Sequence, residues 1–251
     1  MGSARDPEAI VTAANLAEFA TTRWSVVVAA GDTPSPESAA ALETLCRAYW
    51  FPLYAYVRRQ GSSPEEAQDL TQEFFARLLD KKYVGHANPE AGKFRTFLLT
   101  SLKHFLVSQW RKTERQKRGG GQAPISWDAD AAEQSYAAEP PGELTSEKIY
   151  EKRWAIALME RVLARLRDDY HAAEKDRLFE QLKNCVWGDE SPRPYAEIAT
   201  QLGLTEGAVK TSVHRLRQRC RELLRAEIAQ TVARAEEIDD ELRHLIEVFS
   251  G

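Results

Sequence analysis

The sequence predicts an all-α protein with two helical domains joined by a flexible acidic linker. We expect the second domain to end in a helix-turn-helix, followed by a C-terminal helical extension. Apolar residues recur at helical spacing along most of the chain. The one β-branched run, Ser25 to Val28, is short and follows residues that are compatible with a helix. With 251 residues and a hydrophobic share of 43%, the chain can bury substantial cores.

Charge and composition narrow the class of protein. The formal net charge of -4 argues against nucleic-acid binding by the whole surface but leaves room for local basic patches. No apolar run reaches membrane-spanning length, and the first ten residues lack the order of a signal peptide, so we expect a cytoplasmic protein. Cys46, Cys185 and Cys220 are odd in number and widely spaced. We therefore expect three small core residues and neither disulfides nor a metal site.

The first domain is expected over residues 39–118, after an N-terminal extension over residues 1–38. Pro34 and Pro36 mark the break between them. A helix ends near Gly61, and Ser63 and Pro64 begin the next one as cap and first helical residue.

Apolar side chains of this second helix, Ala67, Leu70, Phe74 and Leu78, form its expected buried face. The polar residues expected to stay outside include Gln68, Asp69, Gln72, Glu73 and Arg77.

A loop is expected over residues 83–93, followed by a helix that is apolar over most of its circumference. Its end is basic: residues 103–118 hold six Lys or Arg with His104 and Trp110 among them, against the single acid Glu114. Such a segment can bind a nucleic-acid backbone and stack on an unpaired base. Taken alone, it fits slightly better with a core aromatic residue followed by a solvated run of charge.

Residues 119–147 hold six Asp or Glu, no Lys or Arg, and no periodic apolar face, which predicts the flexible acidic linker. The second domain is expected over residues 148–230. An acidic tail follows over residues 231–251. Apolar residues of this region could dock the tail on a helical surface, and a solvated helical tail is the open alternative. These residues are Ile228, Val232, Ile238, Leu242, Leu245 and Ile246.

The segment Tyr195–Leu224 has the spacing of a helix-turn-helix. Ala199 allows the helices to approach, Gly203 permits a left-handed turn, and Val209 fills the corner between them. Thr205 can cap the second helix through its hydroxyl group. Residues of that helix expected in a buried stripe are Val209, Val213, Leu216, Cys220 and Leu223.

The second helix of this motif is basic on its polar faces. Residues 205–225 hold six Lys or Arg and two Glu, in a protein of negative net charge. This reversal is typical of a helix that enters the major groove of DNA. A three-helix packing unit with a solvated Arg-rich face is the alternative.

Together, these features resemble a bacterial ECF (extracytoplasmic function) sigma factor, a specificity subunit of RNA polymerase. The resemblance covers roughly Leu42 to Leu224. The run from Pro64 to Leu79 resembles region 2.2, and that from Phe94 to Arg118 resembles regions 2.3 and 2.4. Tyr195 to Leu224 is similar to region 4.2.

The resemblance implies a sigma factor that binds core RNA polymerase, at its clamp and flap regions, and promoter DNA. In the region that reads the minus-ten element, the implied DNA-binding residues are His86, Asn88, Lys93, Arg95, Lys103, Trp110, Arg111, Lys112 and Arg115. In the reader of the minus-thirty-five element, they are Lys210, Thr211, His214, Arg215, Arg217 and Arg221. The implied polymerase-docking residues are Glu66, Gln68, Asp69, Gln72, Glu73 and Arg77. The acidic linker would thread a positively lined channel of the polymerase.

The docking helix departs from the family pattern in one respect. Family members carry an Asp-Ala-Glu-Asp-like cluster where this chain has Glu66-Ala67-Gln68-Asp69, so one negative charge is missing. We expect phosphorylation of Thr71 by a Ser/Thr kinase to restore it. An anti-sigma factor is a further candidate partner, and the terminal extensions could regulate the protein in cis.

Two other classes of protein are alternatives to a sigma factor. A dimeric helix-turn-helix regulator with a ligand-sensing first domain explains the DNA reader but not the basic end of the first domain. An enzyme is disfavoured because the sequence lacks metal-binding His/Cys spacing, a phosphate loop after a strand, and a nucleophile with partners. We accordingly expect no catalytic residue, no metal and no cofactor.

Overall fold

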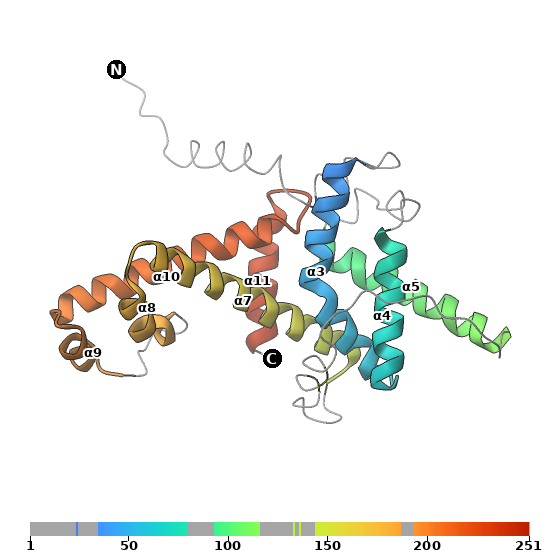
Figure 1. Ribbon diagram of the computed structural model, residues 1–251, viewed down its shortest axis with the longest axis horizontal. Coiled ribbons are helices and arrows are strands. Elements are labelled where there is room, and N and C mark those ends of the chain that lie inside the picture. Colours follow the sequence, from blue (N-terminus) through green and yellow to red (C-terminus); the bar gives the residue numbers. More distant parts are fainter. Residues whose placement is uncertain are drawn as a thin grey trace, which may run out of the picture. The chain divides into compact units, whose positions relative to one another are not determined.

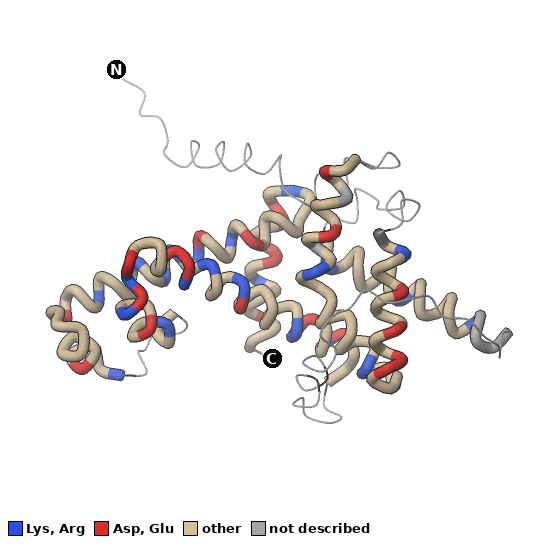
Figure 2. The backbone as a smooth tube through the Cα atoms, in the orientation of Figure 1, with Lys and Arg blue, Asp and Glu red and all other residues tan. Residues whose placement is uncertain are grey.

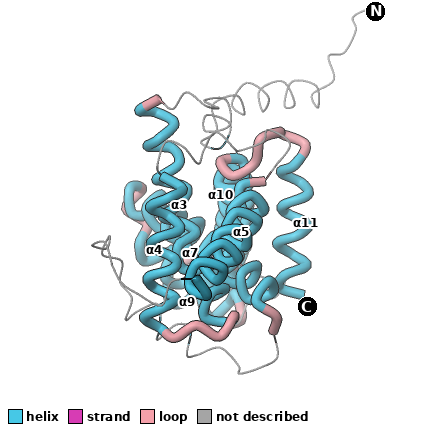
Figure 3. Tube along the Cα trace, turned by 90° about the vertical axis from the view of Figure 1, so that its right-hand side faces the viewer, coloured by secondary structure: helices cyan, strands magenta, loops and turns pink. Residues whose placement is uncertain are grey.

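The computed structural model describes residue 24, residues 35–79 and 93–115, residues 133 and 136, and residues 144–186 and 193–250. Within these ranges the chain is helical and contains no strand (Figure 1, Figure 3). One isolated antiparallel bridge joins Lys93 and Val232. The predicted all-α class, with helical domains and a linker, is confirmed. No helix in the described residues is long and apolar enough to cross a membrane.

The chain divides into two compact units. The described residues up to Ile156 and from Ile228 onward form the first unit, and Ala157–Glu227 form the second. Residues 148–156 and the tail, which we placed apart from the first domain, thus group with it. The functional domain boundaries given above remain predictions.

The first unit contains α3 (Pro36–Arg59), α4 (Pro64–Leu79) and α5 (Phe94–Arg115), with the start of α7 (Ser146–Ala172) and the whole of α11 (Glu237–Ser250). Local signals explain where the first two helices begin. Ser35 and Ser38 form a capping box at the start of α3. Ser63 and Glu66 do the same before α4, since each backbone N–H donates to the other's side chain, at 3.2 and 3.0 Å. The predicted cap at Ser63 is therefore confirmed.

Aromatic side chains dominate the core of the first unit. Phe94, at the start of α5, packs on Tyr49 of α3 and on Trp24, with ring centroids 5.0 and 4.9 Å apart. Phe105 of α5 lies 5.7 Å from Phe74 of α4. All five residues are almost fully buried. The apolar circumference of α5 predicted this packing between neighbouring helices, and α5 contacts both α3 and α4.

The C-terminal segment docks on the first unit. Ile228, Val232, Ile238 and Leu245 are buried, whereas Ile246 is 65% exposed. Most of the residues predicted to dock the tail therefore do so, and the alternative of a solvated tail is excluded for residues 228–245.

The second unit packs the remainder of α7 against α8 (Asp176–Leu182), the short 3-10 helix Lys183–Cys185, α9 (Tyr195–Leu202) and α10 (Glu206–Ala229). Its core contains the predicted stripe of α10 and residues of the preceding helices. The buried members are Val162, Leu166, Phe179, Leu182, Cys185, Val186, Ile198, Ala199, Val209, Val213, Leu216, Cys220 and Leu223. All three cysteines are buried, as expected for small core residues, and none forms a disulfide in the described part of the chain.

Candidate nucleic-acid interface

The turn between α9 and α10 has the backbone that the sequence predicted. Gly203 adopts φ 67° and ψ 31°, the left-handed conformation that glycine accepts without steric cost. The next N–H, from Leu204, donates to the carbonyl of Ala199 at 2.9 Å. Thr205 accepts a hydrogen bond from the N–H of Ala208 at 3.2 Å and so caps α10. These contacts fix the direction in which α10 leaves the turn.

One face of α10 is polar and open to solvent. Figure 2 marks its Lys and Arg positions. The exposed residues among those predicted to bind DNA are Lys210, Thr211, His214, Arg215 and Arg221. Lys210 pairs with Glu206, one turn earlier, at 2.7 Å, and the hydrogen bond and charge of Glu206 raise the pKa of Lys210. The five exposed residues lie between Lys210 and Arg221 on α10.

Arg217 does not belong to this exposed face. Its Nε donates to the carbonyl of Cys185 at 2.8 Å, and its Nη2 is buried without a partner among the described residues. The side chain thereby fastens α10 to the segment after α8. We no longer assign Arg217 to a DNA phosphate, because its guanidinium faces the protein.

A second candidate surface lies at the C-terminal part of α5. Trp110 is 53% exposed, and Val107 and Arg111 beside it are also exposed. The side chains of Lys112 and Arg115 and the whole of His86 and Asn88 lie outside the described residues. The exposure of Trp110 argues against the alternative of a core aromatic residue at this position.

Other basic residues predicted for DNA on α5 have partners within the first unit. Lys103 pairs with Glu147 at 2.8 Å and lies 5.9 Å from the ring centroid of Tyr56. The hydrogen bond from Lys103 lowers the pKa of Glu147. Lys93 and Arg95, at the start of the helix, bind carboxylates, so they do not face solvent as a free basic patch would.

Protein-family models match the two segments of the chain that contain α5 and most of α10. Sigma-70 region 2 matches residues 45–116, and Sigma-70, region 4 matches residues 193–220. The chain belongs to the sigma-70 family. The presence of these two regions indicates a sigma factor of the ECF type. Neither a curated protein nor a solved structure matches the chain.

Region 2 of the sigma factor contains α4, along which Figure 2 marks several Asp and Glu positions. Glu66, Asp69 and Glu73 are exposed, and Gln68 is half-buried. Arg77 forms an ion pair with Glu73 and lies over the ring of Phe105. Glu66, Asp69, Glu73 and Arg77 follow one another at spacings of three and four residues, so they lie along one side of α4.

One predicted docking residue of α4, Gln72, and the predicted phosphorylation site, Thr71, are buried. Gln72 is 7% exposed, and its Nε2 has no partner among the described residues. Thr71 is completely buried, and its hydroxyl donates to the carbonyl of Ala67 at 2.7 Å. The expectations that Gln72 stays outside and that Thr71 lies at a docking face are wrong. A kinase cannot reach a hydroxyl in this position, so we no longer expect Thr71 to be phosphorylated.

Part of the predicted linker of the sigma factor is held on α3. Arg58 binds the carboxylate of Glu133 at 2.9 and 2.8 Å, and the hydroxyl of Tyr54 donates to the same carboxylate. The Arg58 guanidinium also lies 4.8 Å from the ring centroid of Tyr136. These hydrogen bonds lower the pKa of Glu133. Composition alone could not reveal this contact, because it joins residues 75 positions apart.

The contacts of Glu241 are a second feature that sequence reasoning missed. It is buried in α11 and binds Lys93 and Arg95. A signal was present: Glu241 follows Ile238 by three positions and precedes Leu245 by four, so it belongs to the apolar stripe of the helix. A carboxylate on a buried stripe needs a cationic partner.

Proposed function

We propose that this sigma factor binds core RNA polymerase and directs promoter-specific initiation through the minus-ten and minus-thirty-five elements. The order of the two matched regions supports this, region 2 preceding region 4 along the chain. The exposed basic face that follows the left-handed turn at Gly203 supports a DNA-reading role for region 4. The polymerase makes the phosphodiester bonds, and the sigma factor contributes recognition.

For the minus-thirty-five element, we assign base contacts to the part of α10 nearest the turn. Lys210, Thr211, His214 and Arg215 occupy its first turns and are exposed. Arg221, two turns further along, would hold a phosphate. Lys210 would exchange its exposed partner Glu206 for DNA, which costs little because solvent screens an exposed ion pair.

For the minus-ten element, we assign Trp110 as a platform on which an unpaired base stacks. Its exposed indole suits this, since base–aromatic stacking contributes about 1–3 kcal/mol per base. Arg111 lies next to it and would hold the backbone, together with the predicted contributions of Lys103, Lys112 and Arg115. His86 and Asn88 remain candidates for reading the edge of a flipped base.

For polymerase docking, we assign the acidic side of α4 to a basic surface of the polymerase clamp. Glu66, Asp69 and Glu73 would provide the charge, with Arg77 on the same side of the helix, and the half-buried Gln68 would contribute at its margin. Complementary charge across such an interface raises the association rate and selects the partner.

Replacing Asp69 with Lys tests this assignment. The charge reversal on an exposed site should weaken binding to core RNA polymerase by about tenfold, because like charges then face each other. The measurement is co-purification with core polymerase, followed by titration of labelled protein. Asp168→Lys, an equal change at an exposed residue of α7, is the control. If the wild-type chain purifies as a homodimer and never with polymerase, the dimeric regulator is the better interpretation.

A further inference from the structure

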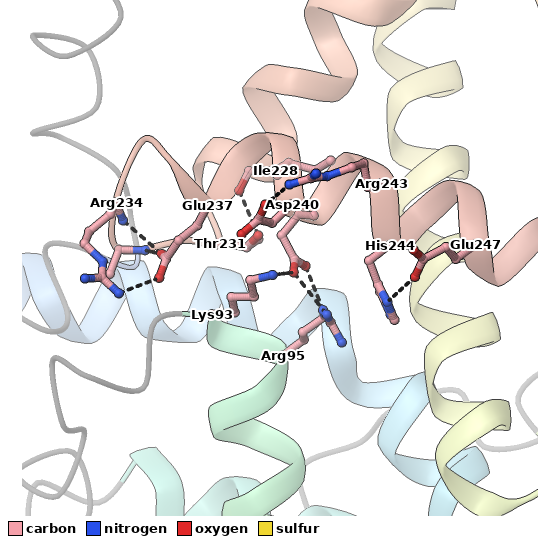
Figure 4. Close-up of polar contacts among 12 residues, drawn as sticks. Lys93, Arg95, Ile228, Thr231, Arg234, Glu237, Asp240, Arg243, His244 and Glu247 are labelled. Atoms are coloured by element: carbon pink, nitrogen blue, oxygen red, sulfur yellow. Dashed lines mark hydrogen bonds and ion pairs between the residues drawn. The ribbon is translucent and has the colours of Figure 1, made fainter.

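The C-terminal segment meets the start of α5 in a cluster of charged side chains. In Figure 4, dashed lines join Lys93 and Arg95 to one carboxylate of the segment, which is that of Glu241. The Lys93 ammonium lies 2.8 Å from Oε1, and the Arg95 guanidinium donates from Nε at 2.7 Å and from Nη2 at 3.0 Å. Glu241 therefore accepts from three charged donors while only 1% of its side chain is exposed.

This arrangement is the one that Lys and Arg offer to a phosphate group. The planar guanidinium presents two parallel N–H donors, and an ammonium group donates a third hydrogen bond from another direction. Glu241 fills the place of the anion. The donors come from Lys93 and Arg95, two residues that sequence reasoning placed on promoter DNA.

A second residue of α11 completes the cluster. The other arm of Arg95 donates to Glu151 of α7 at 2.7 Å, and His244 Nε2 lies 2.8 Å from the second oxygen of Glu151. The ring of Trp154 lies 5.1 Å from the Arg95 guanidinium and 5.8 Å from the imidazole ring. Two cations thus meet two carboxylates, and α11 supplies one carboxylate and the histidine.

Backbone contacts bring this helix to the site. The N–H of Phe94 donates to the carbonyl of Thr231 at 2.8 Å, and Glu237 folds back to accept from the N–H groups of Ala233 and Arg234 at 3.0 and 3.1 Å. The end of α11 is packed less closely than its beginning, because Phe249 is 53% exposed whereas Ile238 is buried. Glu241 thus attaches α11 to Lys93 and Arg95, and His244 attaches it to Glu151 of α7.

We propose that Lys93 and Arg95 form a phosphate-binding pair for the nucleic-acid backbone, and that Glu241 occupies it in the free protein as a cis-acting competitor carried by α11. Binding of DNA exchanges the carboxylate for a phosphate and releases α11 from the cluster. The C-terminal helix thereby lowers the affinity of region 2 for DNA until a correct complex forms. This inference rests on the proposed function, because it gives region 2 a DNA substrate.

The test compares full-length wild-type protein with Glu241→Gln and with Glu236→Gln. Glutamine keeps the shape of the side chain and removes its charge. Glu236 lies in the same segment and is exposed, so its replacement is a control with the same change in net charge. The probe is a fluorescein-labelled single-stranded oligonucleotide of mixed sequence, and binding is followed by anisotropy over a series of salt concentrations.

We expect Glu241→Gln to bind the oligonucleotide about tenfold more tightly than wild type, within the usual range of coupling between two sites. Freeing two cations should also steepen the plot of log K against log salt by about 1.4. Glu236→Gln should match wild type. Equal affinities of the two variants, or no binding by any of the three proteins, would overturn the proposal.

A second measurement uses wild-type protein alone and so does not depend on the folding of a variant. Saturating oligonucleotide should accelerate amide hydrogen exchange across residues 237–250, because the helix leaves its cluster. Unchanged exchange in protein that has bound the probe would show a purely structural role for Glu241. Failure of the proposed function would be seen separately, as absence of promoter-directed transcription with core polymerase.

Discussion

Gly203 is the residue on which the geometry of the helix-turn-helix depends. Its φ of 67° lies in the left-handed region, whereas Gly207, four residues later, lies within α10 and has no positive φ. A Cβ atom added at either position would meet no atom within 4 Å. The two glycines therefore differ in backbone conformation and not in available space.

This difference predicts opposite effects of the same substitution. Gly203→Ala should destabilise the second unit by about 1–2 kcal/mol, because the Cβ atom of an L-residue is too close to the backbone in the left-handed conformation. Gly207→Ala should stabilise it by about 0.4–1 kcal/mol, because the unfolded chain loses freedom. Urea unfolding followed by circular dichroism measures both. Equal shifts of the two midpoints in the same direction would contradict the backbone argument.

Single polar residues were the hardest to place from the sequence. Thr71 follows Ala67 by four positions and precedes Phe74 by three, so the helical period puts it on the buried face. Its hydroxyl can be satisfied by the carbonyl one turn earlier, and its residue type thus gave a misleading expectation. The expectation that Arg217 contacts a DNA phosphate was wrong for a similar reason, because an arginine can turn its guanidinium toward a carbonyl of the protein.

At the scale of the element, α10 combines a buried stripe with an exposed basic face. Its apolar residues lie at helical spacing, so the sequence predicted which side is buried. The exposed face could be predicted for the same reason. By contrast, the docking of α11 through Glu241 joins segments 146 positions apart, and no local pattern specifies such a pairing.

The exposed face of α10 gives a direct prediction for DNA binding. Arg215→Ala should weaken binding to a promoter fragment by about 1–3 kcal/mol if the side chain contacts a base. Arg167→Ala, at an exposed arginine of α7, removes the same charge away from the reader helix and is the control. Gel-shift titration of the holoenzyme measures both. If the two variants lose equal affinity, the effect is one of net charge and not of recognition.

Docking of α11 should depend on pH. Burial would raise the pKa of Glu241, but hydrogen bonds and charge from Arg95 and Lys93 outweigh it, and the pKa lies below the ordinary value of 4.5. The carboxylate therefore contributes its stability fully above pH 4.5, and the contribution is lost as the pH falls through the lower pKa of the folded state.

Comparison of thermal unfolding of wild type and Glu241→Gln between pH 7 and pH 3 tests this dependence. At pH 7 the wild type should be more stable by about 1.5–3 kcal/mol, the range for a hydrogen bond to a charged group. The difference should shrink once the pH falls below the ordinary pKa. A difference that stays constant over the whole range would exclude the ionised carboxylate as its cause.

At the scale of the whole molecule, the sequence was sufficient for the fold class and the family. The turn at Gly203, the caps at Ser63 and Thr205 and the helical stripes are local features, and each could be predicted from neighbouring residues. The grouping of residues 228–250 with the first unit could not, since it depends on contacts between distant segments.

Promoter-directed transcription tests the proposed function most directly. Run-off transcription with core RNA polymerase and genomic fragments should give discrete products only when the protein is added. Arg215→Ala should reduce their yield, and Arg167→Ala should leave it unchanged. No discrete product from any fragment, under conditions in which the protein binds core polymerase, would contradict a role in promoter recognition.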